Sequence, residues 1–189
     1  MDTLLEALVI ATDVWEDAIA QLSWHHGLVV LAYFGAAWFC LVNAHISRQN
    51  RQPHVFWYLG AAVLCLLGVN TVLQADLFVT QLLRAIAKLQ GWYAQRRELQ
   101  YSAVLLLGLM VVLSIKGLRS RLSADDLPSE LVAMGLAALL ALFATRMVSA
   151  HGTDLVLNLR LAGVSVGRLI EFAGIGLVIH GARNCLRLH

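Results

Sequence analysis

Long apolar stretches separated by short polar ones dominate this chain. Five stretches are apolar enough to cross a bilayer as helices, at residues 27–46, 55–73, 101–115, 131–149 and 161–182. A helix needs about 20 residues to cross the hydrocarbon core, so the third stretch is short for a span. The pattern predicts an all-α fold, a polytopic transmembrane helical bundle of about five spans.

Two further segments have the periodicity of amphipathic helices. Residues 1–24 repeat apolar side chains near helical spacing, but five carboxylates interrupt them, too many for a segment that crosses lipid. Residues 77–95 carry an apolar stripe on one side, with Arg84 and Lys88 one turn apart on another. We expect an N-terminal amphipathic helix and an interfacial helix between spans two and three, both at the membrane surface.

Small residues recur along the fourth and fifth spans. They fall four residues apart at Ala133, Ala137 and Ala141, and again at Gly163 and Gly167. Such spacing lets two helix backbones approach closely in lipid, where packing drives helix association. We expect these two spans to be neighbours.

Composition supports one integral membrane domain over residues 1–189. Hydrophobic residues make up 59% of the chain and charged residues 14%, far from the average for soluble domains. The three cysteines are an odd number and predict no disulfide framework. No motif indicates a nucleotide cradle, and nothing in the sequence points to nucleic acid.

The topology prediction places the N-terminus outside and the C-terminus in the cytoplasm, in a bacterial inner membrane. The 14 Lys and Arg residues divide evenly between the two faces, but nine of the 12 acidic residues fall on one of them. We take the face with fewer acidic groups as cytoplasmic, following the tendency of basic residues to stay inside.

Ionisable groups from distant segments are predicted to emerge on the outer face. Apart from the N-terminal helix, seven basic residues there face only Asp76, Glu98, Asp154 and Glu171. Arg146 and Arg168 are expected inside spans, where an unpaired arginine costs at least ~2.5 kcal/mol. We expect Glu171 to pair with Arg168, three residues away on the same helix, and Asp76 to reach Arg146.

The surplus of basic groups predicts a pocket that binds an anionic lipid headgroup or a polar anionic metabolite. In a helical segment, Trp92 and Arg96, and likewise Tyr93 and Arg97, would stack as cation–π pairs that fix the guanidinium planes. The expected ligand contacts are Arg84, Trp92, Tyr93, Arg96, Arg97, Arg146 and Arg168. Membrane lipids are the expected partners.

Other functions stay open at this stage. A membrane-embedded enzyme acting on a lipid-linked substrate would use Glu171 or Asp76 as general base, with His151 as an alternative acid. A structural or assembly subunit would dock partner subunits, or further copies of itself, through its acidic helix and small-residue faces. His45 and His180, expected at similar depth, could ligate a b-type haem. The sequence assigns no particular cofactor, and no metal site has a recognisable spacing.

Overall fold

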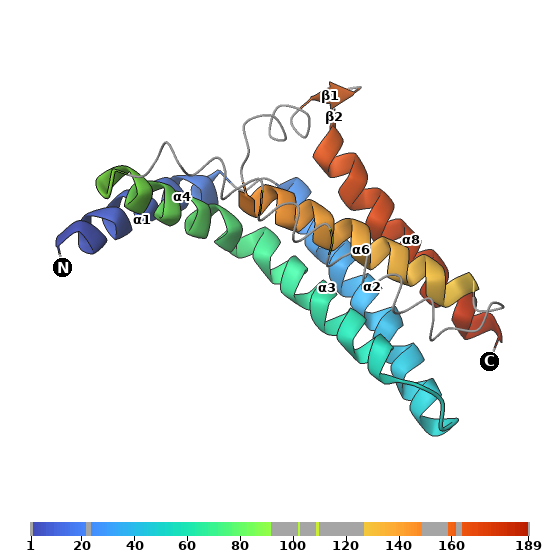
Figure 1. Ribbon diagram of the computed structural model, residues 1–189. Helices are drawn as coiled ribbons and strands as arrows, with labels where there is room; N and C mark the ends of the chain where they lie inside the picture. Colours follow the sequence, from blue (N-terminus) through green and yellow to red (C-terminus); the bar gives the residue numbers. More distant parts are fainter. Residues whose placement is uncertain are drawn as a thin grey trace.

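The computed structural model describes residues 2–21, 24–91, 102, 109, 127–148, 159–161 and 164–188. Its elements in chain order are α1 (Asp2–Ala20), α2 (Trp24–Gln49), α3 (Val55–Leu73), α4 (Ala75–Leu89), α6 (Leu127–Val148), β1 (Arg160–Leu161), β2 (Val164–Ser165) and α8 (Val166–Leu188). Apart from the two-residue strands, the described part of the chain is helical, as predicted (Figure 1).

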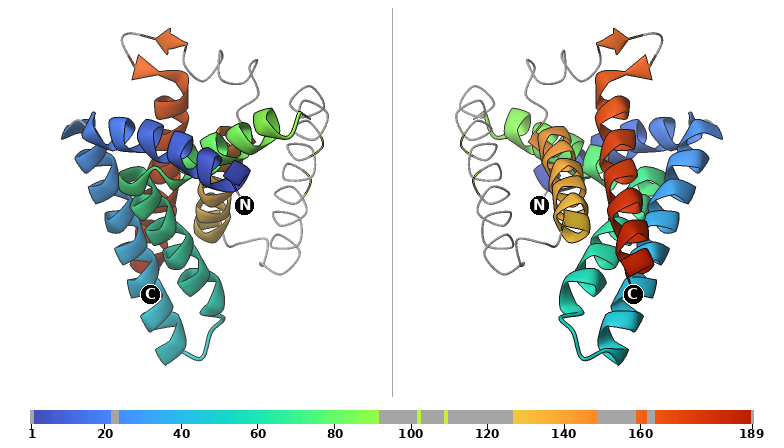
Figure 2. Two further views of the ribbon diagram at one scale, coloured as in Figure 1. Left: turned by 90° about the vertical axis from the view of Figure 1, so that its left-hand side faces the viewer. Right: turned by 90° about the vertical axis from the view of Figure 1, so that its right-hand side faces the viewer.

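Within the described residues, four helices form the bundle and two cross one end of it. α6 packs most extensively on α8, and α2 packs on α3 and α8. α1 packs on α4 and the pair lies across the end of the bundle, while the α2–α3 turn and the C-terminus lie at the other end (Figure 2). This is the placement expected of two amphipathic helices at a membrane surface.

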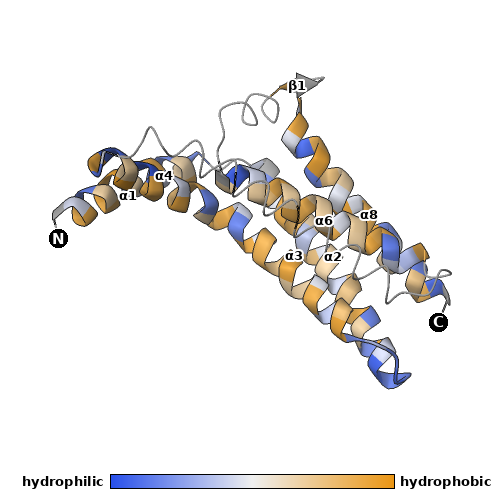
Figure 3. Ribbon diagram, in the orientation of Figure 1, coloured by the Kyte–Doolittle hydropathy of each residue, from blue (hydrophilic) through white to orange (hydrophobic). Residues whose placement is uncertain are grey.

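The bundle helices have the length and composition of membrane spans. The candidate spans in the described residues are His26–Gln49, Val55–Leu73, Leu127–Met147 and Val166–Arg187. Large apolar side chains face outward along them, with Leu31 and Leu66 each 69% exposed, an arrangement that lipid favours and water does not. Apolar colouring covers the middle of these helices, and polar residues gather at the α2–α3 turn (Figure 3). The protein is an integral membrane protein with an all-α helical bundle.

The predicted spans agree with these helices except at the fifth. The third predicted span, 101–115, lies outside the described residues except for Ser102 and Leu109, which are helical. The fifth does not begin at 161. β1 and β2 pair antiparallel there, with Leu161 opposite Val164, and α8 starts only at Val166. Arg168 therefore lies in the first turn of α8, at the end of the bundle, and not two turns inside a span.

The predicted contact between spans four and five is confirmed, and glycines make its closest approaches. A Cβ added at Gly135 of α6 would lie 2.6 Å from the carbonyl oxygen of Gly174 in α8, and one at Gly181 would lie 2.5 Å from that of Pro128. Only glycine allows two backbones this close. Ala137, from the predicted small-residue repeat, is also buried, but it does not set the helix separation.

One residue, Gln74, separates α3 from α4 and turns the chain from the bundle to its end. It has left-handed backbone angles, φ 46° and ψ 41°, and its N–H donates to Asn70 O at 2.7 Å. The Asn70 side chain then holds the start of α4: its Nδ2 donates to Asp76 Oδ1, and its Oδ1 accepts from Asp76 N, both at 3.2 Å. This reciprocal pair fixes Asp76 beside the end of α3.

Trp15 attaches α1 to the same joint. Its indole Nε1 donates to Leu73 O at 2.6 Å, and its ring meets Phe78 edge to face with centroids 5.6 Å apart. Ala7 and Ala11, both fully buried, form the small-residue face through which α1 approaches its neighbours. The packing of α1 thus supports the segment of α3 and α4 that carries Asn70 and Asp76.

Candidate functional site

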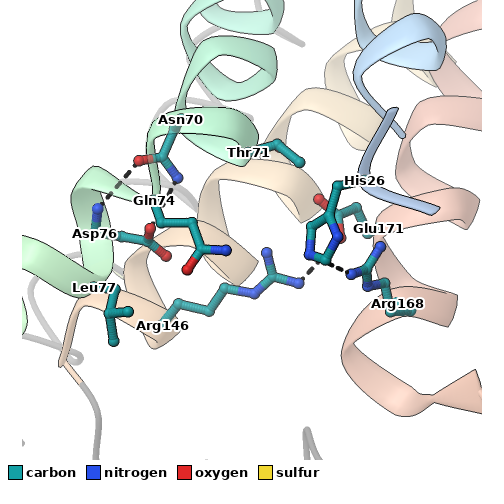
Figure 4. A pocket seen from close by; sticks show the side chains of 9 residues that line it. All are labelled: His26, Asn70, Thr71, Gln74, Asp76, Leu77, Arg146, Arg168 and Glu171. Atoms are coloured by element: carbon teal, nitrogen blue, oxygen red, sulfur yellow. Dashed lines mark hydrogen bonds and ion pairs between the residues drawn. The ribbon is translucent and has the colours of Figure 1, made fainter. Parts of the chain in front are cut away.

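A polar pocket of about 290 Å³ opens where α2, α3, α4, α6 and α8 converge (Figure 4). Its lining residues are His26, Asn70, Thr71, Gln74, Asp76, Leu77, Arg146, Arg168 and Glu171. Eight of these nine side chains are polar or charged, which is unusual between the helices of an apolar bundle.

Glu171 is the buried anchor of the pocket. It is 3% exposed, and each of its carboxylate oxygens has a partner from another helix. Tyr33 Oη of α2 donates to Oε1 at 3.0 Å, and Arg146 Nη2 of α6 donates to Oε2 at 3.1 Å. A buried carboxylate needs such partners because an unpaired charge is expensive to remove from water. The arrangement joins α2, α6 and α8 beneath the pocket.

Arg168 contacts His26 rather than a carboxylate. Its Nη2 lies 3.0 Å from His26 Nε2. A guanidinium only donates hydrogen bonds, so the imidazole nitrogen must be the acceptor, and His26 is neutral in this arrangement. Among the described residues, no acidic side chain pairs with Arg168.

Asp76 faces the pocket from the α3–α4 side, beside Asn70 and Gln74 (Figure 4). Its carboxylate accepts from the neutral Asn70 amide and forms no ion pair with a described basic residue. Asp76 also lies in the first turn of α4, where the helix dipole favours negative charge.

The structure brings Asp76, Arg146, Arg168 and Glu171 to one pocket, although the sequence places them on different helices. The expected pairings were wrong: Glu171 pairs with Arg146 and not with Arg168, and Asp76 bonds to Asn70 and not to Arg146. Arg84 is half-buried on α4 but is not among the lining residues. The remaining predicted contacts, Trp92, Tyr93, Arg96, Arg97 and His151, lie outside the described residues, so their roles stay predictions.

Sequence reasoning missed three contributors, Tyr33, Asn70 and Gln74, as members of this site. A signal was present for two of them, because Asn70 and Gln74 are polar residues one turn apart at the end of an otherwise apolar span. Tyr33 gave no signal, since tyrosine is common in spans near the interface.

The surplus of positive charge predicted for this face stays a prediction, because Arg96 and Arg97, which contribute to it, lie outside the described residues. Among the described lining residues, Arg146 and Arg168 are matched by Asp76 and Glu171. The acidic N-terminal helix does not enter this balance, because Glu6, Asp13, Glu16 and Asp17 form no ion pair with another described residue. The Arg146 side chain runs between Asp76 and Glu171, while Arg168 and Asp76 lie on opposite sides of the pocket (Figure 4).

The histidines considered for haem do not face one another. His45 and His180 are both exposed, and each hydrogen-bonds to a side chain one turn later, Gln49 and Asn184 respectively. Asn43 Nδ2 donates to Ala182 O at 2.9 Å where α2 contacts α8. His45 is two residues after Asn43, and His180 is two residues before Ala182, so each histidine lies about 200° around its helix from this contact. Within the described residues, no group of three His, Cys, Asp or Glu side chains could hold a metal ion.

Fold and site together define a polytopic α-helical membrane protein with a polar pocket, lined by arginines and carboxylates, at one end of its bundle. Comparison of the chain with protein-family models, curated proteins and solved structures gives no match. Functional inference therefore depends on the pocket itself.

Proposed function

We propose that this protein binds the phosphate or carboxylate group of a polar ligand, a lipid headgroup or a metabolite, with Arg146 and Arg168 as the anion contacts. The observation that carries the proposal is that two guanidinium groups from different helices line one pocket while separate partners hold them. A fixed guanidinium presents its remaining donors in the geometry that carboxylates and phosphates require.

Electrostatics on this side of the pocket favour an anion. Glu171 neutralises one arginine, whereas the described partner of Arg168 is a neutral imidazole. One positive charge is therefore left over among Arg146, Arg168, Glu171 and His26. The Arg146 side chain is 36% exposed, so its guanidinium is accessible from the pocket although it is bonded to Glu171.

We place the pocket on the outer face of a bacterial inner membrane, with the α2–α3 turn and the C-terminus in the cytoplasm. Support comes from the basic residues at that opposite end, Arg48, Arg51, Arg183 and Arg187. A cysteine introduced at the exposed Asn50 should react with a membrane-impermeant maleimide in intact spheroplasts only after permeabilisation. Reaction before permeabilisation would reverse the topology.

Neither alternative function has a specific observation in its favour. Glu171, the candidate general base, is 3% exposed, and each of its oxygens accepts a hydrogen bond from a protein side chain, so its contacts are those of a structural anchor. A role as an assembly subunit would produce stoichiometric recovery with other polypeptides. The composition of the purified protein distinguishes these cases: a retained ligand without other polypeptides favours the binding function, and co-purified polypeptides favour the assembly role.

The direct test measures ligand binding to the purified protein in detergent by native mass spectrometry. We compare wild type with Arg168→Gln and use Arg183→Gln as the matched control, because Arg183 is exposed on the same helix at the far end of the bundle. A hydrogen bond to a charged group contributes about 1.5 to 3 kcal/mol, so Arg168→Gln should weaken binding of an anionic phospholipid by roughly tenfold or more. Equal binding by wild type, Arg168→Gln and Arg183→Gln would refute the anion site.

A further inference from the structure

The pocket contains a carboxylate, Asp76, that forms no ion pair with a described residue, and an anion-binding site alone does not require one. Asp76 lines the same cavity as Arg146 and Arg168, but it lies on the α3–α4 side while they come from α6 and α8 (Figure 4). Neither arginine pairs with Asp76; Arg146 contacts Glu171 and Arg168 contacts His26. An anion held by the arginines would leave the carboxylate without a counter-charge among the lining residues.

The structure holds Asp76 in place beside the end of α3. Asn70 fixes its backbone N–H and one carboxylate oxygen through the reciprocal pair of hydrogen bonds at 3.2 Å. Its other carboxylate oxygen, Oδ2, has no hydrogen-bond partner among the described residues. A carboxylate kept at the end of a membrane bundle without an ion-pair partner among the described residues is a candidate for ligand contact.

We propose that the ligand is zwitterionic, an aminophosphate of the phosphoethanolamine type. Its phosphate lies against Arg146 and Arg168, and its ammonium group lies against Asp76. This inference rests on the proposed anion site and adds the second charge of the ligand. A wholly anionic ligand would be repelled by Asp76, whereas a zwitterion matches both sides and leaves the pocket neutral.

The volume of the pocket suits a headgroup and not a whole lipid. At about 290 Å³ it lies at the lower end of the range for small-molecule sites, roughly 300 to 1,000 Å³. Acyl chains would remain in the bilayer beside the apolar outer faces of the helices. The same chemistry is present in phosphatidylethanolamine and in free O-phosphoethanolamine, and separate arms of the experiment distinguish these sources.

The test compares phosphatidylethanolamine with phosphatidylglycerol of identical acyl chains, using native mass spectrometry of the full chain in detergent. We expect wild type to prefer phosphatidylethanolamine by about tenfold, the effect of one charge-assisted contact. Asp76→Asn preserves an acceptor for Asn70 and removes the charge, so the preference should disappear. Asp13→Asn is the matched control, because Asp13 is an exposed acidic residue of α1 with no contact to the pocket.

Wild type alone gives a second measurement that does not depend on the folding of a variant. N-acetylated phosphatidylethanolamine retains the phosphate and loses the positive charge, so it should bind about tenfold more weakly than the parent lipid. Binding of O-phosphoethanolamine, but not of the lipid, would support the zwitterion site and identify a soluble ligand.

The outcomes separate this inference from the proposed function. Phosphatidylglycerol binding that depends on Arg168, with no preference for the amino lipid in wild type, overturns the zwitterion site and leaves the anion site standing. A preference that survives in Asp76→Asn also overturns the assignment of the ammonium contact. Loss of all binding dependence on Arg168 overturns both.

Discussion

Replacement of Glu171 is the most informative single perturbation, because this side chain connects three helices beneath the pocket. Its two oxygens accept from Tyr33 at 3.0 Å and from Arg146 at 3.1 Å, and it is 3% exposed. Glu171→Leu removes both hydrogen bonds and leaves Arg146 without its counter-ion. Glu171→Gln keeps the shape of the side chain, but only its amide oxygen can accept a hydrogen bond. Its NH₂ group would face the donor of the other partner.

The structure sets the expected magnitudes. Breaking a buried ion pair by removing one partner costs about 3 to 5 kcal/mol. Arg146 is 36% exposed and regains some hydration, so Glu171→Leu should lower the free energy of unfolding by about 3 kcal/mol, the low end of that range. Glu171→Gln loses one hydrogen bond involving a charged group and should lower it by about 1.5 to 3 kcal/mol.

The assay is reversible unfolding of the purified protein in mixed micelles, with a double-mutant cycle. Arg146→Met in the Glu171→Leu background removes the uncompensated charge, so the double variant should be more stable than Glu171→Leu alone. Asp13→Asn serves as a control for loss of a surface carboxylate and should change stability by less than about 0.5 kcal/mol. If Glu171→Leu unfolds like wild type, or if the two substitutions are additive, Glu171 and Arg146 are not energetically coupled and the reasoning fails.

Two further predictions concern the packing that supports the pocket. Gly135→Ala places a Cβ 2.6 Å from the Gly174 backbone and should lower the free energy of unfolding by about 1 to 3 kcal/mol in the same assay. Gly176→Ala is the control and should not destabilise the protein, because nothing lies within 4 Å of the added Cβ. Equal effects of the two substitutions would contradict the close α6–α8 contact. Trp15→Phe keeps an aromatic ring near Phe78 but loses the hydrogen bond to Leu73 O, which contributes about 0.5 to 1.5 kcal/mol. Amide hydrogen exchange should therefore become faster in α1 and stay unchanged in the middle of α2. Unchanged exchange in α1 would show that Trp15 does not hold α1 against α3.

Much of the fold follows from local pattern. Hydropathy over some 20 residues decides whether a helix crosses lipid; three predicted spans coincide closely with α2, α3 and α6, and the fifth overlaps α8 but begins five residues too early. Counting spans then brings Asp76, Arg146, Arg168 and Glu171 to one end of the bundle, as the pocket shows. The strand pair before α8 was not anticipated, because apolar Leu161 and Val164 read equally well as the beginning of a span.

The sequence by itself determined that the charged residues Asp76, Arg146, Arg168 and Glu171 lie at one end of the bundle, and only the tertiary structure decided which side chains touch. Glu171 lies three residues from Arg168 on one helix, but Glu171 points into the bundle toward Tyr33 and Arg146 while Arg168 meets His26 in the first turn. The Asp76 carboxylate accepts a hydrogen bond from Asn70 because the left-handed conformation of Gln74 turns the chain between them. Hydropathy and helical period are properties of one segment, whereas partner choice depends on the rotation and separation of several helices. Those are set by contacts such as Gly135 against Gly174, which join residues far apart in the chain.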